Sequence, residues 1–435
     1  MSHGSVAQKY EHLQDLSIYM LMAMLNRLPN KMKKSLTPLF LLTAGMLYAS
    51  GLFAQSPDEM YLAGNASLKK GDYNKAVENL SMAISRDNAD ERLFIHRGDA
   101  FLKLNDPEQA IKDYNEANEI NPGVADFSLA RVYALQGDVV KAVSCLKDHL
   151  GSAFRIEEDS IKKDPAFNRI QESAEWQNLW QNEWYNDSEK SVADARYYLR
   201  KRNVDQAISI LDKALSKDPA NTMVLLARAN AFIKQSNFGA AAGDYSSAIS
   251  KDKMLTEAYA GRGKANIYLG RFKEAVSDFN RVLKDDPSDF ETYLKRAEAN
   301  AGLSNWDAAV KDMQVYLKYF DDDLHAVYVC GGYYYSAGDY INALKCFNRN
   351  LKEDPNNAQY FKARGKTYLK TNTYKYAVSD LSMSLDLNAE DSETWMYHGL
   401  AAIKTGDAQN GCSSLRRAQA MGNTDAVKLV LENCQ

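Results

Sequence analysis

Residues 256–289 alternate apolar and polar positions with the spacing of a helical hairpin. Small and apolar side chains recur every three or four positions, as expected for one buried face on each of two helices. The first face contains Tyr259, Gly263 and Ile267, and the second contains Phe272, Ala275, Phe279 and Val282. Gly270 separates the two faces and Pro287 ends the second. One such hairpin cannot bury both of its faces alone, so the pattern predicts further copies beside it.

The same pattern recurs with a 34-residue period along the second half of the chain. Counting from Ser188, new units begin at Thr222, Thr256, Phe290, Leu324, Ala358 and Ser392. Position 20 of these units is small throughout: Ala207, Ala241, Ala275, Ala309, Ala343, Ala377 and Gly411. Position 32 is proline in three of them: Pro219, Pro287 and Pro355. Small residues at fixed positions predict close helix crossings that repeat from unit to unit.

This pattern resembles the tetratricopeptide repeat family, whose units have small residues at positions 8 and 20, aromatic residues at 11, 17 and 24, and proline at 32. The resemblance implies an all-α fold, a right-handed α-solenoid of about ten tandem hairpins in two arrays. It also implies a surface that binds other proteins, since the fold is used mainly in that way. The Ala54-Gln55 junction near the start of the chain resembles that of exported proteins of Bacteroidota.

The segment 1–54 has a different composition from the rest of the chain. Residues 1–31 are an ill-defined leader, and Met32 is the expected biological start. Residues 32–54 contain Lys33 and Lys34 followed by the apolar run 36–54, which is typical of a secretory signal peptide cleaved after Ala54. An uncleaved membrane anchor over 36–54 and a cytosolic protein are the alternatives. Export to the periplasm or to the exterior of a Gram-negative cell is therefore expected.

The remaining residues divide into two arrays and two capping segments. We expect a first array of three repeats over 55–151, a capping linker over 152–187, a second array of seven repeats over 188–423, and a C-terminal capping helix over 424–435. In the linker, Trp176, Trp180 and Trp184 are spaced at i, i+4 and i+8, which predicts one stripe along a helix. That stripe is expected to cover the end of the first array, and an aromatic ligand cage is the alternative.

Two positions of the repeat predict ion pairs inside the hairpins. In an antiparallel hairpin that turns near position 15, residues whose positions sum to about 30 face each other. Positions 7 and 23 satisfy this condition, and in five units they are arginine and aspartate. The expected pairs are Arg97–Asp113, Arg228–Asp244, Arg262–Asp278, Arg296–Asp312 and Arg364–Asp380. Each could be bidentate, and we interpret them as structural rather than catalytic.

Four of the five cysteines are expected to form two disulfides. In the unit that starts at Leu324, positions 7 and 23 are Cys330 and Cys346, so the same facing argument predicts a bridge, with two reduced core thiols as the alternative. Cys412 and Cys434 lie equally far from the Asn423 turn and are also expected to pair. A helical array end with such cysteines resembles those of exported repeat proteins.

The expected functional surface is the concave groove, where family positions 2, 5, 9, 12 and 13 of each first helix lie. In the second array many of these positions are basic or aromatic: Arg196, Arg200, Lys234, Lys264, Tyr268, Tyr328, Tyr335, Lys362, Lys366, Lys370 and Lys404. A basic, partly apolar groove favours an extended or helical partner that carries carboxylates. The alternative is that exposed lysines only keep the solenoid soluble.

Composition and motifs exclude several other functions. The formal net charge of −4 gives no support for nucleic-acid binding. The sequence has no phosphate-binding loop, no G-x-S-x-G motif and no H-E-x-x-H motif, so no enzyme, cofactor or metal is expected. We therefore predict a non-enzymatic scaffold that binds a protein or peptide in the cell envelope. A membrane-anchored assembly factor, tethered through 36–54, and a glycan- or peptidoglycan-binding protein are the alternatives.

Overall fold

The computed structural model describes residues 56–434, which form 23 α-helices and one short 3-10 helix and contain no strand. The first three hairpins pair consecutive helices, here called helix A and helix B of each unit. Their bounds are α3 (Pro57–Lys70) with α4 (Tyr73–Ile84), α5 (Glu91–Lys103) with α6 (Pro107–Ile120), and α7 (Asp126–Gln136) with α8 (Val139–Gly151). The predicted leader 1–31 and signal peptide 32–54 lie outside the described residues.

The 34-residue register of the second half is visible in its helix boundaries. From the second unit onward, helix A begins at position 1 of the unit and helix B begins at position 17. The helices are α11 (Asp187–Arg200), α12 (Val204–Lys217), α13 (Thr222–Lys234), α14 (Phe238–Lys251), α15 (Thr256–Tyr268), α16 (Phe272–Asp285), α17 (Phe290–Gly302), α18 (Trp306–Tyr319), α19 (Leu324–Ala337), α20 (Tyr340–Glu353), α21 (Ala358–Lys370), α22 (Tyr374–Leu387), α23 (Ser392–Lys404) and α24 (Ala408–Ala420). The predicted all-α solenoid of tandem hairpins is confirmed.

One backbone conformation fixes the turn inside every hairpin of the second array. Position 15 of the unit has a positive φ, both where it is glycine, as at Gly270, and where it is not, as at Ser236. The next residue is the N-cap of helix B, and in several units it is an Asn or Asp whose side chain caps the new helix. Asn237, for example, accepts a hydrogen bond from the amide of Ala240. The turn therefore tolerates residues other than glycine, at the cost of a strained backbone.

Small residues let the two helices of a hairpin approach closely. A Cβ built on Gly263 would lie 2.7 Å from an aromatic carbon of Phe279 in the facing helix. Both Phe279 and Ala275 are fully buried at this crossing. The spacing of small and aromatic residues in the sequence thus sets the distance between helices A and B.

The segment between the two arrays is less regular than expected. It contains α9 (Glu158–Lys162), the 3-10 helix η1 (Pro165–Phe167) and α10 (Ala174–Leu179). The prediction of one helical stripe through Trp176, Trp180 and Trp184 is wrong, because α10 ends at Leu179. The polar residues that follow lead into Asn186, which caps α11. All three indoles nevertheless pack in the apolar cluster that covers the end of the first array.

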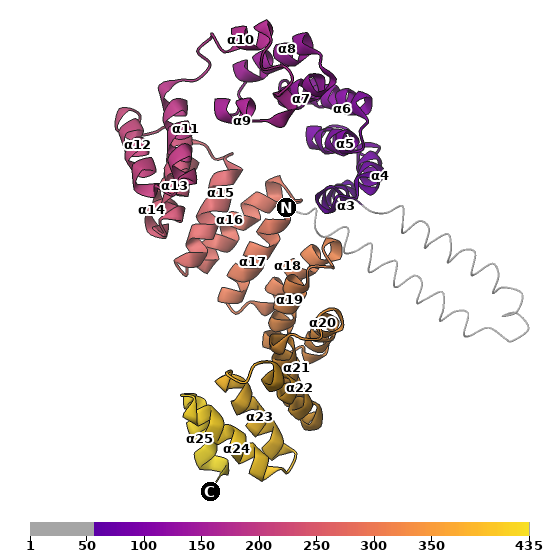
Figure 1. The fold of residues 1–435 in the computed structure, drawn as a ribbon, viewed down its shortest axis with the longest axis vertical. Helices are drawn as coiled ribbons and strands as arrows, with labels where there is room; N and C mark the ends of the chain where they lie inside the picture. The colour runs from indigo at the N-terminus through magenta and orange to yellow at the C-terminus, as the bar shows by residue number, and fades with distance from the viewer. Residues whose placement is uncertain (1–55, 435) are drawn as a thin grey trace, which may run out of the picture.

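The path of the chain closes on itself, which the sequence did not indicate. Helix α3, at the start of the first array, lies beside α17 and α18, although these helices are far from it in the sequence (Figure 1). The units from α3 to α18 therefore form a ring, and α19 to α24 leave it as an arm that ends in α25 (Thr424–Asn433) (Figure 1). Within residues 56–434, no helix combines the length and the apolar character needed to cross a bilayer.

Candidate functional site

The structure brings together all ten residues of the five expected Arg–Asp pairs. Each arginine uses Nε and Nη2 to donate to the two carboxylate oxygens of the aspartate that faces it. The N–O distances lie between 2.5 and 3.0 Å, for the pairs Arg97–Asp113, Arg228–Asp244, Arg262–Asp278, Arg296–Asp312 and Arg364–Asp380. The aspartates are buried while the arginines keep a partly exposed edge. These pairs lie between helices A and B, away from the groove.

A third contact of each arginine was missed by the sequence argument. Its Nη1 donates to position 25 of the preceding unit, as Arg228 does to Asp212 at 2.6 Å and Arg364 to Asn348 at 2.8 Å. Position 25 is serine, aspartate or asparagine in each case: Ser81, Asp212, Ser246, Asn280 and Asn348. The recurrence of polar acceptors at position 25 is a signal that could have revealed this contact. The arginine therefore fixes both its own hairpin and the stacking of consecutive units.

In two units, positions 7 and 23 are occupied by residues other than arginine and aspartate. His398 occupies position 7 and bonds Ser414 in its own hairpin and Ser382 in the preceding unit, at 2.9 and 3.1 Å. Cys330 and Cys346 occupy positions 7 and 23 of the unit that starts at Leu324, and their thiols interact. The predicted disulfide between them is wrong, because both are free thiols in the structure. The sequence argument established only that they face each other, and a bridge requires a much narrower geometry.

The second predicted bridge is present. Cys412 in α24 and Cys434 after α25 form a disulfide, with their Cα atoms 5.5 Å apart. It joins the C-terminal capping helix to the last hairpin, where Ala426 of α25 packs against Leu415 and Ala418 of α24. Cys145 is a free, half-buried thiol in α8.

The structure alters the expected charge of the groove. Lys264 and Lys366, both at position 9, form ion pairs with Glu291 and Glu393, both at position 2 of the next unit, at 2.7 and 2.8 Å. Lys362 pairs with Asp391 and Glu393 at 2.9 and 3.1 Å. Arg196 and Arg200 pair with Glu157 and Asp159 of the linker. The acidic partners that we expected from a ligand are thus partly supplied by the next repeat.

The remaining groove residues are more accessible. Lys234, Lys370 and Lys404 are exposed at the ends of their helices. Tyr268 is also exposed, and its ring stacks on Phe238 with the two centroids 4.2 Å apart. These four side chains are not part of one cluster.

Tyr328 and Tyr335 line a pocket of about 550 Å³ between three successive A helices. Helix α19 supplies Tyr328, Gly332, Tyr333 and Tyr335, α21 supplies Lys362 and Lys366, and Trp306 and Phe347 complete the wall. Burial lowers the pKa of Lys366, but the ion pair with Glu393 outweighs it and raises the pKa, so the ammonium group stays charged. The pocket therefore combines aromatic walls with cations that are already neutralised by carboxylates.

Gly332 leaves this pocket open. A Cβ built at Gly332 meets no atom within 4 Å, whereas one built at the adjacent Gly331 would lie 2.6 Å from Phe347. Gly331 is therefore needed for the helix crossing, while Gly332, at groove position 9, leaves space for a ligand. The arrangement can bind an apolar side chain of a partner by burying it against tyrosine rings.

The family model of the tetratricopeptide repeat matches residues 61–125, 192–253 and 261–323. The chain belongs to the tetratricopeptide repeat family. The match covers units of both arrays, and the 34-residue helix boundaries extend the repeat to α24. Tetratricopeptide repeats generally mediate contacts between proteins.

Two relatives match this chain over short segments only. Human serine/threonine-protein phosphatase 5 is 36% identical over 55 residues, which are 13% of this chain and 11% of the phosphatase. The heat shock protein sti1 homolog of Schizosaccharomyces pombe is 32% identical over 78 residues, 18% of this chain and 13% of that protein. The matches thus span little more than a tenth of the length of these relatives.

Among solved structures, a tetratricopeptide repeat protein from Parabacteroides merdae is 20% identical, with a TM-score of 0.42, over 56% of this chain and 97% of that one. The C-terminal part of a repeat-containing protein from Cytophaga hutchinsonii is 17% identical, with a TM-score of 0.47, over 55% and 98% of the two chains.

Across residues 56–434 of this protein, no three His, Cys, Asp or Glu side chains are grouped as metal ligands.

Proposed function

We propose that this protein is a non-enzymatic scaffold of the bacterial cell envelope that binds a peptide segment of a partner protein. The observation that carries the binding role is the aromatic pocket around Gly332, because it is open, lies across three A helices and is lined at positions that face the groove. An apolar side chain of the partner occupies the pocket, while polar groups of its backbone meet the rim of Lys362, Lys366 and Ser336.

Two features support export. The apolar run 36–54 after Lys33 and Lys34 has the composition of a secretory signal peptide. The disulfide between Cys412 and Cys434 is of the kind that persists in an oxidising compartment. Intact mass of the protein from its native cell tests this point: a chain that begins at Gln55 supports cleavage, and a chain that retains 36–54 favours the membrane-anchored assembly factor.

The binding role is tested by changing the size of the side chain at position 332. Gly332→Leu places a branched side chain in the pocket, and Gly332→Ala is the matched control because it adds only a methyl group, which enters open space. The probe is a displayed library of random peptides selected on the wild-type protein. We expect enriched peptides that carry a large apolar residue, that bind the Ala variant as well as the wild type, and that lose binding to the Leu variant.

Two results would contradict this function. The first is a library from which no peptide is enriched. The second is a set of peptides that binds all three proteins equally, which would place binding elsewhere on the solenoid. Circular dichroism and melting temperature of the three proteins test whether the fold stays intact, so that a loss of binding can be assigned to the pocket.

A further inference from the structure

The contact that closes the ring combines a small apolar cluster with polar contacts on both sides. Leu62 and Ala66 of α3 are buried against Phe290, with Tyr293, Tyr319 and Phe320 packed around them. In a solenoid the outer face of the first helix is an open end, which is usually capped by polar residues. Here the outer face of α3 is apolar at Leu62 and Ala66, and the middle of the same chain covers it.

Ion pairs flank this cluster at both ends of α3. Glu59 in its first turn pairs with Lys318 at 3.1 Å. Lys70 in its last turn pairs with Asp322 at 3.2 Å and Asp321 at 3.6 Å, and donates to the carbonyl of Tyr319 at 3.2 Å. These groups are partly exposed, so each pair alone contributes little to stability. Their placement selects one position of α3 along the edge of α18.

A buried polar contact adds specificity. Asn65, which is 6% exposed, donates to the hydroxyl of Ser288, which is 1% exposed, at 2.5 Å. Ser288 in turn donates to Asp286. Beside it, Arg92 of α5 donates to the carbonyl of Asp285 at 2.7 Å. A buried and satisfied polar pair would be costly to break by a shift of α3, so the contact has one register.

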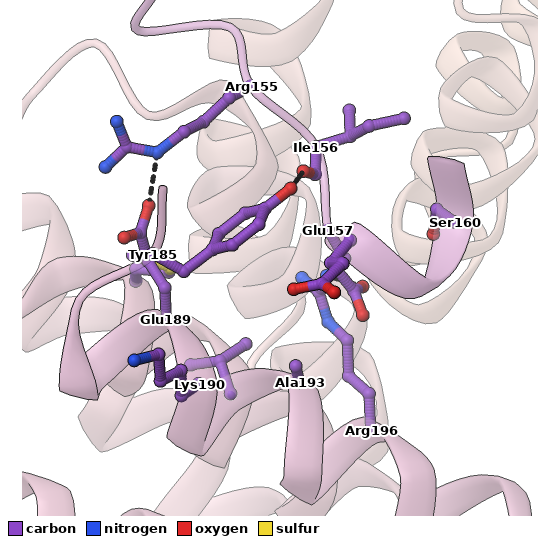
Figure 2. Close-up of a pocket in the computed structure, with 12 residues that line it drawn as sticks. Arg155, Ile156, Glu157, Ser160, Tyr185, Glu189, Lys190, Ala193 and Arg196 are labelled. Carbon is purple, nitrogen blue, oxygen red and sulfur yellow. Dashed lines mark hydrogen bonds and ion pairs between the residues drawn. The ribbon is translucent and has the colours of Figure 1, made fainter. Parts of the chain in front are cut away.

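The opposite side of the ring is joined by a seam of a different kind. Residues 155–160 meet α11 across a cavity of about 480 Å³ (Figure 2). Two ion pairs cross it, Arg155 to Glu189 at 2.7 Å and Arg196 to Glu157, and at its edge the hydroxyl of Tyr185, just before α11, donates to the carbonyl of Ile156 at 2.6 Å (Figure 2). The buried core of the linker, around Phe167 and Trp176, forms one apolar cluster, and the core of the second array around Val192 forms another.

We propose that the ring opens and closes, with the α3 contact as its latch and the seam at residues 155–160 and α11 as its hinge. This proposal goes beyond the binding role of the groove. The latch consists of Glu59, Leu62, Asn65, Ala66 and Lys70 of α3, with Arg92 of α5, against the segment from Asp285 to Asp322. The apolar clusters on the two sides of the cavity are separate and side-chain ion pairs bridge it, so the hinge can rotate while each cluster stays packed, although Ile156 and Val192 at the cavity wall become more exposed. The rest of each array is packed unit against unit. Opening uncovers an apolar helix face and an aromatic edge.

The latch can be tested by reversing and then restoring its charges. Glu59→Lys with Lys70→Glu leaves the net charge of α3 unchanged but opposes Lys318 on one side and Asp321 and Asp322 on the other. Adding Lys318→Glu, Asp321→Lys and Asp322→Lys restores attraction. The charge-reversed protein, Glu59→Lys with Lys70→Glu, is the first opening variant. A second opening variant, Leu62→Asp, removes the apolar part of the latch. The full chain is measured by small-angle X-ray scattering and amide hydrogen exchange, with circular dichroism to verify that the helices remain.

We expect both opening variants to have a larger radius of gyration than the wild type, and the restored variant to match the wild type. Amide exchange should increase in the turns at 285–290 and 319–323 and in the hinge segment 155–160, with no change in α21 to α24. Identical scattering of the wild type and both opening variants, with intact helicity, would refute the latch. A wild-type dimer that dissociates in the opening variants would assign the α3 contact to a second copy and refute the intramolecular ring.

Discussion

Arg364 and Asp380 form a two-point ion pair inside one hairpin, with Nε 2.6 Å from Oδ2 and Nη2 2.8 Å from Oδ1. Nη1 of Arg364 also donates to Asn348 of the preceding unit. Removal of the Asp380 carboxylate therefore leaves a half-buried guanidinium without its charged partner. We expect Asp380→Ala to lower the free energy of unfolding by about 3 kcal/mol. Urea denaturation measures this change.

The control for that prediction replaces both partners. Arg364→Met with Asp380→Leu removes both charges and keeps apolar volume, so its cost should be well below that of Asp380→Ala. The exposed Asp386 in the same helix gives a second control, and its change to Ala should stay within about 0.5 kcal/mol. Equal costs for Asp380→Ala and Asp386→Ala would show that the pair has no structural role.

The cysteines should separate into three reactive classes. Burial raises the pKa of Cys145 to about 11, and the interaction with Cys346 together with burial raises the pKa of Cys330 further. The same interaction lowers the pKa of Cys346, so Cys346 should be alkylated first in the native protein at about pH 8. Mass spectrometry should find three alkyl groups after unfolding without reductant and five after reduction. One group without reductant would mean that Cys330 and Cys346 are bridged after all.

His149 should make the linker sensitive to acid. Its side chain is 2% exposed, and its Nε2 accepts the backbone amide of Ile156 at 3.1 Å. Burial lowers its pKa from 6.5 to about 4, so the unfolded chain binds a proton at a higher pH than the folded chain does. Its contribution to stability is complete above pH 6.5 and is lost as the pH falls towards 4.

Between pH 7.5 and pH 5, the contribution of residue 149 to the free energy of unfolding should fall by about 2 kcal/mol in the wild type. In His149→Gln this contribution should not change with pH. Urea denaturation of both proteins at the two pH values isolates the contribution, because the other titrating groups are common to both. His325→Gln, at an exposed position, is the matched control. The same pH dependence in all three proteins would exclude His149 as its source.

Lys366 and Lys370 should respond differently to charge reversal. Lys366→Glu breaks the ion pair with Glu393 and places two carboxylates together, which should cost about 1 kcal/mol and lower the melting temperature. Lys370→Glu changes an exposed side chain and should leave the melting temperature unchanged. A loss of peptide binding in Lys370→Glu with an unchanged melting temperature would extend the binding surface beyond the pocket. Equal melting temperatures of the two variants would contradict the ion pair.

The sequence was sufficient for features that repeat locally and insufficient for those that depend on the sum of many repeats. The 34-residue period located helix A and helix B of each unit, and the facing of positions 7 and 23 placed Arg262 beside Asp278. The ion pair of Lys264 with Glu291 needs the next repeat as well, and the separate units gave no indication of it. The meeting of α3 with Phe290 depends on the curvature accumulated over the intervening hairpins and on the bend at the linker, which no single unit encodes.

The hydrogen bonds of the latch join residues that lie between 193 and 259 positions apart, from Arg92 with Asp285 to Glu59 with Lys318. Most other side-chain hydrogen bonds of the described residues are far more local, and that of Arg200 with Asp159 spans 41 positions. Repeats can fold as soon as their neighbours exist, because their contacts are local. Closure of the ring must wait until both ends have formed, so it follows the stacking of the units between them and depends on the chain from α3 to α18.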